Sequence, residues 1–257
     1  MNKINRLFSE SRGKKILSLY FCAGCPGKED TADILRAMQR RGIDMAEVGI
    51  PFSDPMADGP AIQDAAARAL RNGMTLATIF RQLREVKDEI RIPVVLMGYL
   101  NPVMQYGMER FCRDCAESGV SGAIIPDLPF RDYAERVKPV ADRYGIRMIM
   151  LITPETSEER IRLIDSHTDG FLYMVSSSAT TGEQEDFGGA CREYFRRVNA
   201  MNLRNPRMIG FGISNRRTLK SALENAAGAI IGSKFVTLLG ESRNADEALD
   251  RLFRALD

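Results

Sequence analysis

Short apolar runs alternate with amphipathic segments along this chain of 257 residues, and the alternation restricts the fold more than any other feature. Several runs, such as PVVLM at 93–97, are apolar throughout, which is typical of parallel strands that are covered on both faces. We therefore expect eight strands, at 16–22, 45–50, 93–97, 122–126, 147–151, 170–175, 207–211 and 227–231.

Amphipathic segments between these runs predict helices. They lie at 31–41, 61–73, 76–90, 108–118, 131–144, 157–165, 189–201 and 215–225, and two further helices are expected near the chain ends, at 5–12 and 245–255. Eight βα units in about 250 residues are typical of a (β/α)8 barrel. We predict an α/β fold, a TIM barrel with an extra N-terminal helix, in which residues 1–257 form one domain; a doubly wound open sheet is the alternative.

Composition and charge exclude several classes of function. A content of 44% apolar and 27% charged residues is that of a folded globular chain. The 36 Lys and Arg residues are scattered and nearly balanced by 34 Asp and Glu residues, so nucleic acid is not expected as a partner. The chain has no apolar segment of signal-peptide or membrane-spanning length, which predicts a cytoplasmic protein without a membrane partner.

The chain contains two C-x-x-C pairs, Cys22 with Cys25 and Cys112 with Cys115. The two pairs lie too far apart in the sequence for a typical zinc ribbon, so we expect these cysteines to be reduced thiols. The single histidine, His167, precedes the sixth strand, at the end of the barrel opposite an active site. No lysine lies inside a strand. These positions argue against a metal site with three histidines and against a buried Schiff-base lysine.

Glu47 is the most unusual residue of the predicted strands, because it places a carboxylate within the apolar run at 45–50. Burial of an unpaired carboxylate is costly and raises its pKa, so Glu47 is a candidate acid/base group. By the period of two it shares a face with Met45 and Gly49. A structural ion pair with an arginine of a neighbouring strand is the alternative.

The loop that follows, at 51–60, contains three prolines and two carboxylates. Proline restricts the backbone, so Asp54 and Asp58 are expected to be held over the mouth of the barrel. Asp58 followed by Gly59 and Pro60 also resembles a helix start, in which Asp58 would act only as the N-cap.

Glycines after the last strands predict a phosphate site. Gly212 follows the seventh strand, while Gly232 and Ser233 follow the eighth, and these two loops commonly bind phosphate in a barrel. Gly182, in the small-residue loop after the sixth strand, would complete the site. Tight turns between strands and helices are the alternative explanation for these glycines.

The segment 47–63, EVGIPFSDPMADGPAIQ, resembles the signature of the tryptophan synthase alpha chain family, and the resemblance extends over nearly the whole chain. It includes MGYLNP at 97–102, PDLP at 126–129 and GFGIS at 210–214. The resemblance implies a (β/α)8 barrel that cleaves indole-3-glycerol phosphate to indole and glyceraldehyde 3-phosphate. It also implies transfer of indole to a β chain in an α2β2 assembly, with pyridoxal phosphate in the β chain and no cofactor in this one.

The resemblance also implies roles for individual residues. Glu47 would be the general acid/base, and Asp58 would bind the indole N–H and stabilise the charge that develops there. The residues implied to bind the substrate are Ile62, Tyr99, Leu100, Tyr173 and Thr181, and those implied to bind its phosphate are Gly182, Gly212, Gly232 and Ser233.

Some positions depart from the family pattern, including Cys22, Cys25, Ser177 and Lys234, and Lys234 would add a positive charge beside the phosphate. Two other functions stay open. One is a catalytically idle barrel that acts as an allosteric partner of a β chain, and the other is a different phosphosugar enzyme on the same fold.

Overall fold

The computed structural model describes residues 1–176 and 187–257. Eight parallel strands form a closed barrel in the order of the sequence, which confirms the barrel and rejects the open sheet. The strands are β1 (Ile16–Cys22), β2 (Met45–Gly49), β3 (Val94–Met97), β4 (Gly122–Ile124), β5 (Arg147–Ile152), β6 (Leu172–Val175), β7 (Arg207–Gly210) and β8 (Gly228–Ile231).

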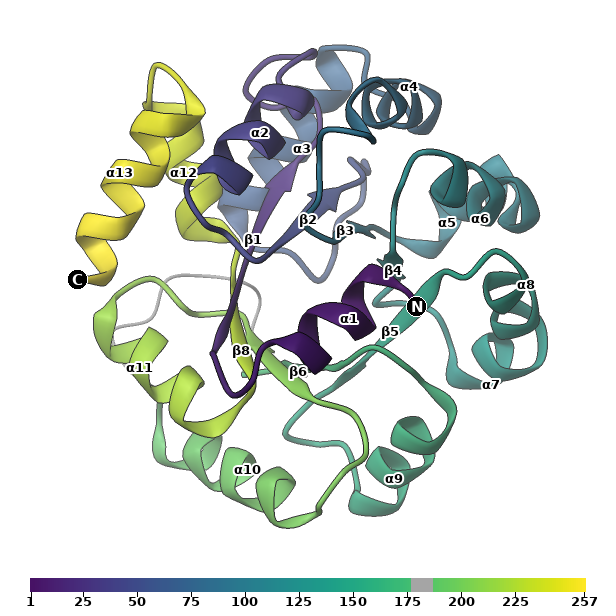
Figure 1. The fold of residues 1–257 in the computed structure, drawn as a ribbon, viewed down its shortest axis with the longest axis vertical. Coiled ribbons are helices and arrows are strands. Elements are labelled where there is room, and N and C mark those ends of the chain that lie inside the picture. Colours follow the sequence, from purple (N-terminus) through teal and green to yellow (C-terminus); the bar gives the residue numbers. More distant parts are fainter. Residues whose placement is uncertain (177–186) are drawn as a thin grey trace.

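Helices surround this barrel, as Figure 1 shows. They are α1 (Lys3–Glu10), α2 (Thr31–Arg40), α3 (Pro60–Arg71), α4 (Leu76–Val86), α5 (Leu100–Tyr106), α6 (Met108–Glu117), α7 (Phe130–Asp132), the π-helical turn η1 (Tyr133–Val137), α8 (Lys138–Arg143), α9 (Glu158–His167), α10 (Gly189–Ala200), α11 (Arg216–Asn225), α12 (Ser233–Glu241) and α13 (Ala245–Leu256). No helix in the described ranges has the length and apolar character needed to span a bilayer.

The helix predicted at 131–144 is the main correction to the expected elements. The chain there forms three short pieces, α7, η1 and α8. Pro139, in the first turn of α8, has no N–H to donate to the preceding turn, and this loss is compatible with the wider π-helical turn before it. The N-terminal helix also begins and ends two residues earlier than expected, because Asn2 caps it and accepts a hydrogen bond from Ile4 N.

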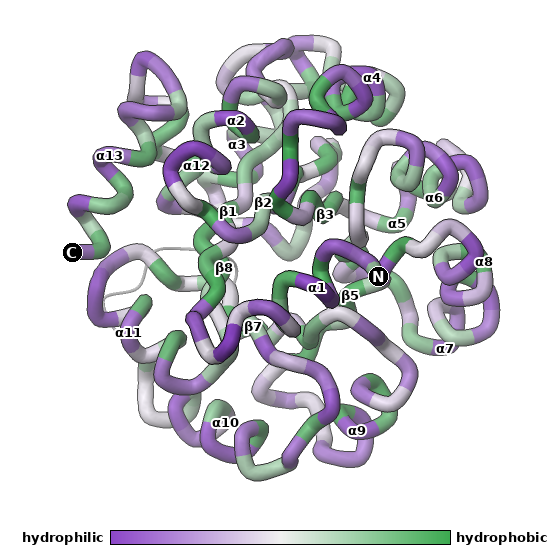
Figure 2. Tube along the Cα trace, in the orientation of Figure 1, coloured by the Kyte–Doolittle hydropathy of each residue, from purple (hydrophilic) through white to green (hydrophobic). Residues whose placement is uncertain are grey.

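The core has two parts. One fills the interior of the barrel and includes Ile16, Met45, Val95 and Ile230, and the other lies between the strands and the surrounding helices. Helix α1 crosses the N-terminal end of the barrel (Figure 1), where the wholly buried Ile4 covers the interior cluster. The tube in Figure 2 is mostly apolar along the central strands and mostly polar along the outer helices. The end opposite α1 is therefore the open end of the barrel.

Asp165 holds the segment that leads into β7. Its carboxylate accepts hydrogen bonds from Arg204 N at 2.7 Å, Asn205 N at 2.9 Å and Asn205 Nδ2 at 2.8 Å. We expect Asp165→Ala to lower the free energy of unfolding by about 3 kcal/mol, because the backbone N–H groups of Arg204 and Asn205 lose their acceptor, whereas Asn205 Nδ2 keeps the carbonyl of residue 165. Urea denaturation measures this change. Asp142→Ala, which removes a half-exposed ion pair with Lys138, should change the stability by less than about 0.5 kcal/mol; equal effects of the two variants would contradict the assignment.

Candidate active site

Glu47 lies inside the barrel as the period of two predicts, on the face of β2 that also carries the buried Met45. Its side chain is 0% exposed, and one oxygen, Oε2, has no hydrogen-bond partner. The other oxygen, Oε1, accepts a hydrogen bond from Ser18 Oγ at 3.3 Å. Burial raises the pKa of Glu47 to about 8, against the smaller opposite effect of the Ser18 hydroxyl. No arginine pairs with Glu47 in the ranges that the structure describes, so the alternative of a structural ion pair is wrong.

Burial of Glu47 links its protonation to stability. The folded chain holds a proton on Glu47 up to about pH 8, whereas the unfolded chain releases it near pH 4.5, so stability falls as the pH rises between these values. We expect Glu47→Gln to be more stable relative to the parent at pH 8 than at pH 5, by about 3 to 4 kcal/mol. Urea unfolding at both pH values measures the difference. A difference that does not change with pH would contradict the buried, protonated state.

Asp58 lies in the loop between β2 and α3, and its role differs from that of a cap. Helix α3 begins at Pro60 with Gly59 as its N-cap, so the expectation that Asp58 caps this helix is wrong. Instead, Tyr99 Oη donates to Asp58 Oδ2 at 2.9 Å and accepts a hydrogen bond from Ala57 N at 2.9 Å. Burial raises the pKa of Asp58, and the Tyr99 hydrogen bond opposes that rise. Tyr99 therefore fixes both the loop and its carboxylate.

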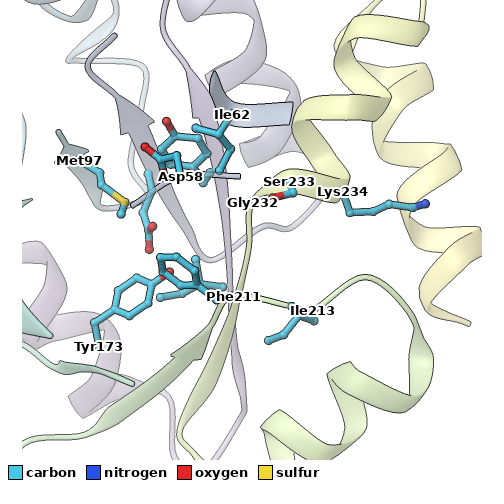
Figure 3. Close-up of a pocket in the computed structure, with 13 residues that line it drawn as sticks. Asp58, Ile62, Met97, Tyr173, Phe211, Ile213, Gly232, Ser233 and Lys234 are labelled. Atoms are coloured by element: carbon cyan, nitrogen blue, oxygen red, sulfur yellow. The ribbon is translucent and has the colours of Figure 1, made fainter. Parts of the chain in front are cut away.

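One cavity at the open end of the barrel joins the two carboxylates. Figure 3 shows Asp58, Met97 and Tyr173 on one side of the cavity and Gly232 and Ser233 on another. The residues that line it are Tyr20, Glu47, Asp58, Ile62, Met97, Tyr173, Phe211, Gly212, Ile213, Ile230, Gly232, Ser233 and Lys234.

Helix α12 begins at this cavity, and its N-cap residue has no side chain that could cap it. Its N-cap is Gly232, and its first residue is Ser233. By contrast, the neighbouring helix α11 has a complete capping box between Asn215 and Thr218. The first N–H groups of a helix have no partner within it, and together with the helix dipole they favour an anion. Of these two helices, α12 is therefore the one whose first turn is open to an anion such as phosphate.

Most of the predicted site residues converge on the cavity. Ile62, Tyr173, Gly212, Gly232 and Ser233 line it together with the two carboxylates. Tyr99 lies behind Asp58, and Leu100 is absent from the lining; its N–H donates to Asp127 Oδ1 at 2.8 Å. Thr181, Gly182 and Ser177 lie outside the described residues.

The structure adds residues that the sequence did not single out, among them Tyr20, Met97, Phe211 and Ile230. Tyr20 lies on β1 opposite Glu47. Its ring can occupy this place because residue 49 is a glycine, and a Cβ on Gly49 would overlap the Tyr20 hydroxyl group. The ring of Phe211 meets that of Tyr173 edge to face at 5.8 Å. An inward-facing tyrosine in strand one was the signal available in the sequence for Tyr20.

Comparison with known proteins identifies the family of this chain. The family model described as tryptophan synthase alpha chain matches residues 8–255. The chain belongs to the tryptophan synthase alpha chain family. It is 62% identical to the tryptophan synthase alpha chain of Parabacteroides distasonis over 256 residues, which covers 100% of this chain and 99% of the relative. It is 60% identical to the Bacteroides fragilis protein over 252 residues, covering 98% of this chain and 95% of the relative.

Solved structures of the tryptophan synthase alpha family share the fold. The alpha chain of Legionella pneumophila has a TM-score of 0.89 and 32% identity, with coverage of 100% of this chain and 96% of that one. The alpha subunit of Pyrococcus furiosus has a TM-score of 0.85 and 36% identity, with coverage of 94% and 97%. The relatives thus establish that the chain belongs to a lyase family, and the solved structures establish that this family has the same barrel fold.

Proposed function

We propose that this chain cleaves indole-3-glycerol phosphate to indole and glyceraldehyde 3-phosphate, as the alpha subunit of a tryptophan synthase. The observation that carries the proposal is that one cavity joins a buried carboxyl group, Glu47, whose Oε2 has no partner, to the start of α12 at its N-cap glycine. The carboxyl group fits the reacting bond, and the helix terminus fits the phosphate. The cavity between them is largely apolar, as an indole ring requires.

The phosphate is proposed to bind at the start of α12. The backbone N–H group of Ser233 would donate to the phosphate oxygens, and Gly212 and Gly232 lie beside it in the cavity lining. Gly182, which lies outside the described residues, remains a proposed contributor to the phosphate site, and Thr181 remains a proposed contributor to the rest of the substrate site. Lys234 also lines the cavity and adds a positive charge at this end.

Glu47 is the proposed proton donor and acceptor. With a pKa near 8 it carries a proton at neutral pH, which it gives to the indole carbon that bears the glycerol side chain. The resulting carboxylate then takes the proton of the adjacent side-chain hydroxyl. As the aldehyde forms, the bond between the ring and the side chain breaks, and its electron pair returns to the indole ring. The proton on Glu47 is thereby restored.

Asp58 is proposed to bind the indole N–H. Protonation of the ring carbon places positive charge on the ring nitrogen, and a carboxylate at hydrogen-bond distance stabilises that charge before it is neutralised. The Tyr99 hydroxyl donates to Asp58 and so favours its ionised form despite burial. Ile62, Tyr20 and Phe211 supply the apolar surface around the ring.

A β chain is the proposed partner, in an α2β2 assembly, and pyridoxal phosphate is expected in that chain alone. Two exposed methionines support a contact at the open end of the barrel, since Met56 is 85% and Met104 is 63% exposed. Met56 lies in the loop that carries Asp58, and Met104 lies in α5, which begins directly after Tyr99. Large exposed apolar side chains are typical of protein contacts. Indole leaving through this contact would be sheltered from water.

The idle barrel is the second candidate, and the intact pair of Glu47 and Asp58 in one cavity disfavours it. An assay distinguishes the active enzyme from the idle barrel: the purified chain is incubated with indole-3-glycerol phosphate, and indole and glyceraldehyde 3-phosphate are measured. We expect equal amounts of both products, released slowly alone and faster with a β chain. Binding of the β chain without either product would support the idle barrel, and turnover of a non-indolic phosphosugar would support a different enzyme.

The pH dependence of indole release follows from the state of Glu47. Because the reaction starts from the protonated form, kcat/KM should fall about tenfold per pH unit once the pH exceeds the Glu47 pKa of about 8. Initial rates between pH 6 and pH 10 test this expectation. An activity that rises through pH 8 would show that the ionised form starts the reaction.

A further inference from the structure

Ser18 is an unusual residue for the interior of this barrel. It and Glu47 are both 0% exposed, and no other serine, threonine or charged residue in the eight described strands is buried. Ser18 pairs in register with Met45 on β2 and with Ile230 on β8, both of which belong to the apolar interior cluster. A buried hydroxyl group in such surroundings lowers stability unless it makes a hydrogen bond.

The hydrogen bond that Ser18 makes is to Glu47. Tyr20, two residues further along β1, lies directly opposite Glu47, so Ser18 lies on the same inward face and one step deeper in the barrel. Its Oγ donates to Glu47 Oε1 at 3.3 Å, and Oε2 has no partner. Ser18 is the one hydrogen-bond donor to Glu47 among the described residues. The carboxyl group is thus held by one oxygen.

We propose that Ser18 is the positioning residue of Glu47: its hydroxyl group holds Oε1 at the closed side of the cavity and leaves Oε2 as the oxygen that exchanges a proton with the substrate. The last step rests on the proposed function, whereas the contact itself does not. The hydroxyl also stabilises the carboxylate that forms when Glu47 gives up its proton. Ser18 therefore acts through Glu47 and does not touch the reacting atoms.

Four other titratable groups face the same cavity and contribute to the electrostatic environment of Glu47. They are Tyr20 from β1, Tyr173 from β6, Asp58 from the loop after β2 and Lys234 from α12. Burial raises the pKa of both tyrosines, so they are neutral near pH 8, and Asp58 is held by Tyr99. Because Ser18 favours the ionised form of Glu47, its removal should shift the titration of Glu47 upward.

The test is the titration of Glu47 itself in substrate-free protein, followed by the infrared band of its protonated carboxyl group and assigned by its loss in Glu47→Gln. For Ser18→Ala we expect the midpoint to rise by about half a unit to one unit. Ser18→Cys keeps a weaker donor and should shift it in the same direction by less. The control is Ser118→Ala, which removes a buried hydroxyl group in the outer helices and should leave the midpoint in place.

Kinetics provide the second readout. Ser18→Ala should lower kcat for indole release about three- to tenfold, with KM changed less than twofold, and the alkaline limb should move with the carboxyl midpoint. An unchanged midpoint in both Ser18 variants, or a change in KM alone, would overturn the proposal. The titration needs no substrate, so the role of Ser18 is decided even if the chain does not cleave indole-3-glycerol phosphate. Should Ser18→Ala fail to fold, Ser18→Cys provides the same two measurements.

Discussion

Glu47→Gln is expected to lower kcat for indole release by about 10³-fold while KM changes little. Proton transfer by a placed side chain contributes about 10²- to 10⁴-fold, and glutamine can neither give nor take the proton. Its amide has nearly the same size as the carboxyl group, so the barrel should keep its shape. Steady-state assays of indole formation at pH 7 measure the effect.

A matched control separates this effect from the loss of a charge elsewhere. Glu85 is half-exposed on α4, where it pairs with Arg81, and no residue of α4 lines the cavity. Glu85→Gln should therefore leave kcat and KM unchanged. Parental activity in Glu47→Gln would remove Glu47 from the mechanism, whatever the structure of the variant.

Asp58→Asn is expected to lower kcat/KM by about 10²- to 10³-fold, which is typical when one charge-stabilising group is lost. Asparagine still accepts the hydrogen bond from Tyr99 and fills the same space, but it has no negative charge to oppose the positive charge on the indole nitrogen. The loss should lie mostly in kcat, because the charge develops only during the reaction.

The control for Asp58 comes from the same loop. Asp54 is exposed and accepts a hydrogen bond from Ser53, and it does not line the cavity. Asp54→Asn should therefore retain parental activity. A change confined to KM in Asp58→Asn would show that Asp58 binds the ground state and the transition state equally. It would then not stabilise the charge that develops in the transition state.

The strands were the most predictable part of this molecule. Each observed strand begins and ends within two residues of its expected bounds, as at 45–50 against Met45–Gly49. The reason is physical: parallel strands that are covered on both faces need apolar runs, and glycines or charged residues interrupt the chain on either side. The hydrophobic period cannot report strand order, so closure of the barrel came from the structure.

Two helices next to the site were not predicted, α5 and α12. Helix α12 buries Phe235, Val236, Leu238 and Leu239 in nine residues, so it shows no narrow apolar stripe to distinguish it from a loop or strand. It packs against α13, α3 and β1. The N-terminus that is open to an anion belongs to this missed helix, even though its glycine and serine were recognised.

The candidate site was predictable where a residue broke the pattern around it. Glu47 is a carboxylate in an apolar strand, and Asp58 lies in a proline-rich loop. Met97, Phe211 and Ile230 could not be found in this way, because an apolar residue that lines a cavity has the same chemistry as one in the core. Leu100 is the reverse case: it was predicted to bind the substrate because it lies in a recognised motif, but it does not line the cavity.

The central claim is that a carboxyl group inside this barrel keeps its proton at neutral pH and gives it to the substrate. The most direct measurement is the infrared titration of Glu47 in the parent protein, with Glu47→Gln as the reference. We predict that the band of a protonated carboxyl group persists at pH 7 and disappears with a midpoint near pH 8. A midpoint near the ordinary value of 4.5 would contradict the claim, because Glu47 would then have no proton to give at neutral pH.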